Sequence, residues 1–159
     1  MEPIGLLMTE HRLIERMIKL LEKESVSIRQ TGEVRIALIE ASIDFIRTYA
    51  DKTHHMKEED ILFQDLSRKP LAPEHRKILD GLFAEHNEGR KHVGLLIAGK
   101  EKYLKNETGA NNEMAVNMEF LARFYPAHID KEDNHFFEPA MHYFTKFGAG
   151  GDGSEVPGV

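Results

Sequence analysis

Apolar residues along the chain recur at alternating spacings of three and four residues, which is the period of a helix that buries one face. The rhythm predicts four long helical segments, over residues 4–27, 33–67, 73–103 and 113–147. The connections carry residues that break helices: Thr31-Gly32, Pro70 with Pro73, and a loop over 106–112. No strand pattern competes with these segments. Four helices with short connections predict an all-α fold, an antiparallel up-down-up-down four-helix bundle.

The last third of the chain adds two expectations. Pro126 lies inside the fourth segment, where it should kink or restart the helix just before His128, because proline donates no helical hydrogen bond. Residues 148–159 contain five of the chain's 12 glycines and no helical pattern. We therefore expect one four-helix domain over residues 1–147, followed by a flexible Gly-rich tail over 148–159.

Polar residues interrupt the apolar stripe of every predicted helix. They are His11, His54, Glu58, His86, His128 and Glu132. A histidine and a glutamate four residues apart lie one turn apart on the same helix face, so both side chains can reach one ion. Burying two carboxylates without partners is unfavourable, and metal cations would compensate for that cost.

The same polar pattern occurs twice. Glu10-His11 recurs 75 residues later as Glu85-His86, and the His-x-x-x-Glu pair that begins at His54 recurs 74 residues later at His128. Two nearly equal offsets indicate two similar halves, and a pseudo-twofold arrangement would bring four imidazoles and two carboxylates together. Such a ligand set suits two metal ions. One pair alone would equally fit a buried hydrogen-bond network without metal, but its repetition across four helices favours the metal site.

The stretches around these residues resemble the hemerythrin-like (HHE cation-binding) family. They are residues 7–11, 54–63, 85–90 and 128–133, and the resemblance extends over about residues 4–147. It implies a four-helix bundle with two non-haem iron ions, with zinc or manganese as substitutes. It also implies that the six residues of the stripes are the metal ligands, and that Glu58 and Glu132 bridge the two ions.

The third helix departs from the pattern of oxygen-carrying hemerythrins, which have a second histidine four residues from the first. Here Leu82 and Arg90 occupy the positions on either side of His86. One ion therefore lacks a nitrogen donor unless His55 or His135 supplies it, and we do not expect reversible oxygen carriage. His55 projects about 100° from His54 and is more often a supporting or surface residue. His135 follows His128 on the same face, as a further ligand or as a hydrogen-bonded core residue.

Composition narrows the function further. The net charge of −6 argues against a nucleic-acid partner, and no apolar run approaches the ~20 residues of a membrane span. The chain has no cysteine, which excludes thiolate metal sites and leaves nitrogen and oxygen as ligands. The N-terminus carries no secretory signal, so a cytoplasmic protein is expected.

These observations lead to one main functional hypothesis and two alternatives. The main hypothesis is a cytoplasmic di-iron protein that binds or senses dioxygen, nitric oxide or peroxide. The alternatives are a protein that handles iron or repairs damaged iron centres, and a bundle in which the metal is purely structural. No sequence feature names a catalytic acid, base or substrate pocket, so whether the protein is an enzyme stays open. The sequence is compatible with a homo-oligomer.

Overall fold

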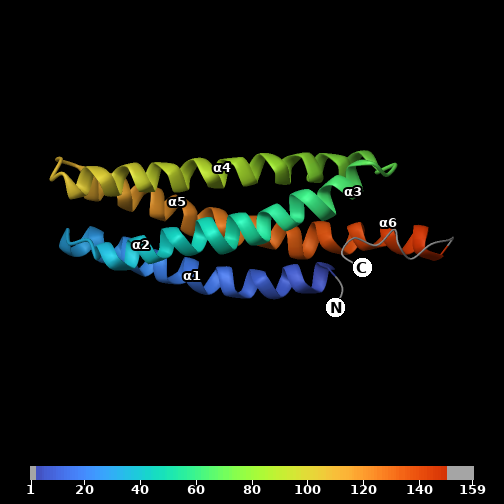
Figure 1. Ribbon diagram of the computed structural model, residues 1–159, viewed down its shortest axis with the longest axis horizontal. Coiled ribbons are helices and arrows are strands. Elements are labelled where there is room, and N and C mark those ends of the chain that lie inside the picture. The colour runs from blue at the N-terminus through green and yellow to red at the C-terminus, as the bar shows by residue number, and fades with distance from the viewer. Residues whose placement is uncertain (1–2, 150–159) are drawn as a thin grey trace.

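The computed structural model describes residues 3–149 of the chain and the side chains of residues 5–143. These residues form four long helical rods, and the four-helix prediction is confirmed (Figure 1). The first rod is α1 (Pro3–Thr31) and the third is α4 (Pro73–Leu104). The second and fourth rods each contain π-helical segments. The second consists of α2 (Ile36–Phe45), η1 (Ile46–His55), η2 (Glu58–Phe63) and α3 (Gln64–Ser67), and the fourth of α5 (Ala110–Lys131), η3 (Glu132–Phe136) and α6 (Phe137–Ala149).

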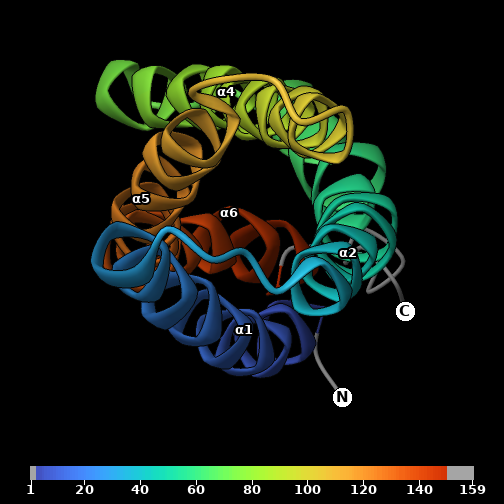
Figure 2. The same ribbon diagram turned by 90° about the vertical axis from the view of Figure 1, so that its left-hand side faces the viewer.

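Consecutive rods run antiparallel and pack side by side, and the fourth rod closes the bundle against the first (Figure 2). This is the up-down-up-down arrangement expected from short connections. Within the described part of the chain, no helix has the combination of length and apolarity needed to cross a membrane.

The connections follow from local backbone chemistry. Gly32 and Gly109 have φ angles of +74° and +83°, a conformation that costs glycine little, and each lies at a turn between rods. Pro73 stands in the first turn of α4, where its missing N–H has no helical partner to lose. The third connection is shorter than predicted, because α5 begins at Ala110, inside the predicted loop.

The expected restart of the helix at Pro126 is wrong, because α5 continues through this residue to Lys131. Pro126 itself is exposed, and the carbonyl group that it leaves without a helical donor is that of Ala122. The neighbouring side chains of Tyr125 and Ile129 are buried in the core, and this packing holds the helix together across the proline. At the end of the chain, α6 includes Gly148 and Ala149, and the rest of the predicted flexible tail lies outside the described residues.

The core consists of two apolar clusters with a polar layer between them. The larger cluster includes Ile14, Leu21, Ile39, Leu96 and Leu121, and the smaller one includes Leu7, Phe63, Leu82 and Phe137. In each of the first three rods a buried histidine separates the residues of one cluster from those of the other, as His11 does between Leu7 and Ile14, and in the fourth rod Glu132 lies between Ile129 and Phe136. The bundle therefore holds a buried polar layer with apolar packing on both sides.

A pair of adjacent leucines in α4 tests the packing. Leu96 is fully buried in the larger cluster, whereas Leu95 is 38% exposed. Leu96→Ala should lower the free energy of unfolding by about 3 kcal/mol through lost burial and a residual cavity. Leu95→Ala, the control, should change it by less than about 1 kcal/mol. Urea titration of metal-free protein measures both values, and equal losses would contradict this placement of α4.

Candidate metal centre

The polar layer brings together all six residues predicted from the sequence, which are called the central six below. They are His11 from α1, His54 from η1, Glu58 from η2, His86 from α4, His128 from α5 and Glu132 from η3. Each of them is at most 3% exposed. Their inward-facing atoms are the Nε2 atoms of the four imidazoles and the oxygens of the two carboxylates. The four rods thus contribute to one enclosed constellation.

The distances within the central six repeat in pairs, as the internal repeat predicts. The Nε2 of His11 lies 3.0 Å from Glu132, and the Nε2 of His86 lies 3.1 Å from Glu58. Within each His-x-x-x-Glu pair the corresponding distance is 3.4 Å in the first half and 3.3 Å in the second. Both longer contacts, from His11 to Glu58 and from His86 to Glu132, are 3.9 Å. Each carboxylate therefore lies between histidines of both halves.

Four further carboxylates surround the layer and fix the orientation of the rings. The Nδ1–H groups of His11 and His54 donate to Asp133 and Glu10, both at 2.8 Å. In the second half, His86 donates to Glu59 at 3.1 Å and His128 to Glu85 at 2.7 Å. A ring that donates from Nδ1 presents the free electron pair of Nε2 on its other side, so all four Nε2 atoms face inward as metal-binding nitrogens.

Basic side chains neutralise these outer carboxylates. Lys57 donates to Glu10 at 2.7 Å, and Lys131 donates to Glu85 at 2.6 Å, again at equivalent positions of the two halves. Arginines do the same for the other pair, since Arg12 binds Asp133 and Arg90 binds Glu59. Although partial burial acts to raise it, the pKa of Glu59 falls to about 2 because His86 and Arg90 donate to the carboxylate.

The atoms inside the layer are left without partners. Among the described residues, none forms a hydrogen bond with the Nε2 of His11, His54, His86 or His128, or with the oxygens of Glu58 and Glu132. A bare imidazole nitrogen only 3.0 Å from a carboxylate oxygen is unfavourable unless a positive charge lies close to both. The donor set, nitrogen and oxygen without sulfur, fits a divalent first-row transition metal. These residues therefore fit the metal centre that the sequence predicted.

Without a cation, protons must balance the buried charge. Burial raises the pKa of Glu58 to about 8, and the adjacent Glu132 adds to that effect. Burial also acts to raise the pKa of Glu132, but His128 and His11 face this carboxylate and hold its pKa well below the usual range. For His128, burial acts to lower the pKa, yet Glu132 and Glu85 raise it to about 10. In the metal-free layer, protons therefore supply the positive charge that a bound cation would otherwise supply.

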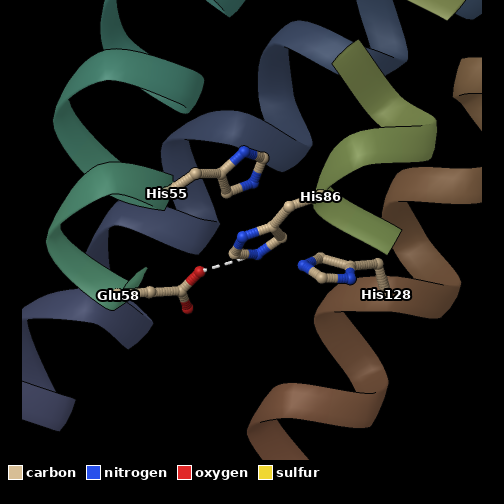
Figure 3. Close-up of side chains that lie close together, drawn as sticks. All are labelled: His55, Glu58, His86 and His128. Atoms are coloured by element: carbon tan, nitrogen blue, oxygen red, sulfur yellow. Dashed lines mark ion pairs between the residues drawn. The ribbon is translucent and has the colours of Figure 1, made fainter. Parts of the chain in front are cut away.

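The structure brings His55 to the layer as well. It is 3% exposed, and its ring stacks on that of His86 with the centroids 4.1 Å apart. One ligand atom from each of His55, Glu58, His86 and His128 lies within 4.8 Å of the others, and Figure 3 shows the four side chains converging. The π-helical turns of η1 are wider than those of an α-helix, which allows the consecutive residues His54 and His55 both to be buried.

His55 is neutral in this position. Burial lowers its pKa to about 3, with Asp51 opposing the shift and the imidazoles of His86 and His54 adding to it. The alternative candidate, His135, is not part of the site. Its side chain is 65% exposed and lies 3.8 Å from Asp130, because the helical turn at η3 directs it to solvent. The expectation that His135 is a further ligand or a core residue is therefore wrong.

Sequence reasoning missed the outer carboxylates and their lysines as part of the site. The signal was present, because Glu10 and Glu85 recur with the 75-residue offset. Lys57 and Lys131 likewise recur with the 74-residue offset of the second and fourth rods. Their role could have been found by asking what the Nδ1 atom of each candidate ligand contacts.

A surface cleft leads to the layer from one side. It has a volume of about 480 Å³ and lies between η1 and α4. We call it the η1–α4 cleft. Its lining residues are Ile46, Arg47, Asp51, His55, Arg90, Val93, Gly94, Ile97 and Tyr125. Because His55 belongs both to the cleft and to the layer, the cleft reaches the layer at this residue.

Comparison with known proteins is consistent with this geometry. The family model described as the hemerythrin HHE cation binding domain matches residues 2–140, which include the whole polar layer. No curated protein and no solved structure shows a significant match to the chain.

Metal binding should stabilise the fold, because a cation would satisfy atoms that otherwise have no partner. At metal concentrations about a thousandfold above Kd, the melting temperature should rise by on the order of 10 °C relative to chelator-treated protein. Glu132→Gln should remove most of this rise. Asp130→Asn, a change at an exposed acidic residue two positions away in the chain, should retain it. A metal-independent melting temperature in calorimetry would argue against a cation site in the layer.

Proposed function

Because the chain belongs to the hemerythrin HHE cation-binding domain family, we propose that it holds two non-haem iron ions and binds or senses dioxygen, nitric oxide or a peroxide. The observation that supports the proposal is the set of buried, unpartnered nitrogen and oxygen atoms shared by four helices. Iron bound there would supply a redox-active cation with coordination positions open to small molecules.

The ligand atoms of the layer fall into two groups, and we assign one ion to each group. Two pairs of imidazoles would each hold one ion, His11 with His54 and His86 with His128. Glu58 and Glu132 would span both ions, since each has contacts with histidines of both halves. Zinc or manganese could occupy the same donor set.

His55 would add a third imidazole to the ion held by His86 and His128. Its neutral ring and its place within 4.8 Å of their ligand atoms support this role. The two ions would then have three and two nitrogen donors. His55 would thereby replace the nitrogen donor that the third helix does not provide. Whether the protein carries oxygen reversibly is therefore decided by experiment.

The surrounding residues suit a small, reactive ligand. Phe63 and Phe137 are buried beside the layer, stacking at 5.5 and 5.6 Å from His86 and His11, and they exclude water from that end. The outer carboxylates hold each ring in a fixed tautomer and orientation. Small molecules would enter from the opposite end, along the η1–α4 cleft.

Elemental analysis tests the two-ion proposal. Protein reconstituted with ferrous iron should bind two ions per chain. Because each carboxylate contacts both halves, Glu58→Ala and Glu132→Ala should lose more than one ion, whereas His11→Ala should lose chiefly one. The control is His135→Ala, which removes an exposed histidine and should retain both ions. Equal losses in all variants that change the layer would contradict the bridging assignment.

Exposure to oxygen tests the reaction type. Reduced, iron-loaded protein should be oxidised by dioxygen and should not regain its ferrous spectrum when the gas is removed under vacuum. The reason is that the η1–α4 cleft gives water and protons access to the centre. Repeated full recovery of the spectrum would instead establish reversible carriage. In that case His55→Ala would show whether the fifth imidazole is what makes recovery complete.

A further inference from the structure

The η1–α4 cleft changes in character along its length. Ile46, Val93 and Ile97 provide apolar surface away from the centre, whereas Arg90, Tyr125 and His55 provide polar groups beside it. In α4, Arg90 and Ile97 lie seven positions apart, which corresponds to roughly 10 Å along the helix axis. The cleft is therefore elongated, with a polar inner end and an outer part that is aliphatic apart from the exposed Arg47.

Its size exceeds what a diatomic ligand or hydrogen peroxide requires. A water-sized molecule occupies ~30 Å³, and the cleft has a volume of about 480 Å³. Volumes in this range are typical of sites for organic molecules. A simple gas channel would not need this volume or the aliphatic surface that Ile46, Val93 and Ile97 present.

The inner end offers hydrogen bonding without uncompensated charge. Tyr125 is 2% exposed, and its hydroxyl has no hydrogen-bond partner among the described residues, so it can donate to a ligand in the cleft. Arg90 is held between Asp51 at 2.7 Å and Glu59, which compensate its charge, and the other basic lining residue, Arg47, is an exposed side chain eight positions before His55. A neutral oxygen-bearing group fits this end better than an anion does.

The internal repeat shows that this cleft differs from its counterpart in the other half of the molecule. A smaller cleft of about 260 Å³ is called the α1–α5 cleft. It is lined by the α1 residues that the internal repeat relates to the α4 residues of the η1–α4 cleft. There Lys19 stands in place of Gly94, and Glu22 in place of Ile97. Ile129, which is equivalent to His55, does not line it. Only one half of the repeat thus combines aliphatic surface with a path to the polar layer.

We propose that the η1–α4 cleft binds a neutral aliphatic molecule with an oxygen head group, namely an alkyl hydroperoxide or the corresponding alcohol. The alkyl chain lies along Ile46, Val93 and Ile97, and the oxygen accepts a hydrogen bond from Tyr125 next to His55. The biological meaning of this ligand depends on the proposed function, since two ferrous ions held by the layer would supply two electrons that, with two protons, would break the O–O bond of the hydroperoxide and release the alcohol and water. Binding of the alcohol requires no reaction and can be measured separately.

Calorimetry with 1-hexanol and oxidised, iron-loaded protein tests the proposal. An added side chain at Gly94 meets no atom within 4 Å of its Cβ, so Gly94→Leu should fill the cleft without disturbing the fold. This change should weaken hexanol binding by at least about tenfold. Lys19→Leu, the equivalent position of the α1–α5 cleft, is the matched control and should leave binding unchanged. Ile97→Glu, which introduces the residue of the counterpart cleft, is the second variant should Gly94→Leu fold poorly.

The head group is tested by removing one hydroxyl. Tyr125→Phe keeps the ring but should weaken hexanol binding by about fivefold, the effect of one neutral hydrogen bond. Tyr49→Phe serves as the control, because Tyr49 packs on Phe45 outside the cleft. Hexanol binding that is unchanged in Gly94→Leu and Ile97→Glu, or absent from the unmodified protein, would overturn the proposal.

A kinetic comparison distinguishes the alcohol from the hydroperoxide and separates this inference from the proposed function. Oxidation of the reduced centre by hexyl hydroperoxide should slow by about tenfold in Gly94→Leu, whereas oxidation by hydrogen peroxide should slow much less, because one added side chain leaves part of the cleft of about 480 Å³ open to a molecule little larger than water. Equal slowing with both oxidants would contradict a cleft specific for alkyl chains. If neither oxidant reacts but hexanol binding still depends on Gly94, the proposed function fails and the binding cleft stands as a site for the alcohol.

Discussion

The structure depends on how one layer of buried charge is balanced. Two glutamates and four imidazoles meet in the middle of an apolar bundle, and their inward-facing atoms have no partner within the described chain. In a medium of low polarity, such a layer is stable only when positive charge lies inside it, as protons or as metal cations. The apolar packing on both sides keeps water out of the layer, so that water cannot solvate these groups in place of the positive charge.

Charge alternates outward from the centre, and this alternation positions the groups as well as stabilising them. The inner carboxylates are surrounded by imidazoles, the imidazoles donate to outer carboxylates, and lysines and arginines bind those carboxylates near the surface. Each ring is thereby held from behind, with its metal-binding nitrogen directed inward. The orientation of the metal-binding nitrogens therefore depends on the four basic side chains that bind the outer carboxylates, as well as on the residues of the layer itself.

Much of this could be predicted from the sequence, because helical periodicity and an internal repeat are both local patterns. They located the four rods and the central six. They could not locate His55, because α-helical geometry places it 100° from His54, and the sequence does not show the π-helical geometry of η1, in which both are buried. The same change of helical geometry at η3 defeats the expectation for His135. The helix does not restart at Pro126, because tertiary packing outweighs the local preference of proline.

The hydrogen bond from His11 to Asp133 joins residues 122 positions apart in the chain, whereas the other three histidines find their carboxylates within 44 positions. During synthesis, which proceeds from the N-terminus, the first three helices can therefore emerge with His54 and His86 already able to reach their partners. His11 has no partner until the fourth helix has left the ribosome. A nascent chain that stops before residue 110 lacks the fourth rod, and with it His128 and Glu132, so such a chain cannot close its core. The order of translation thus delays formation of the centre until nearly the whole domain is present.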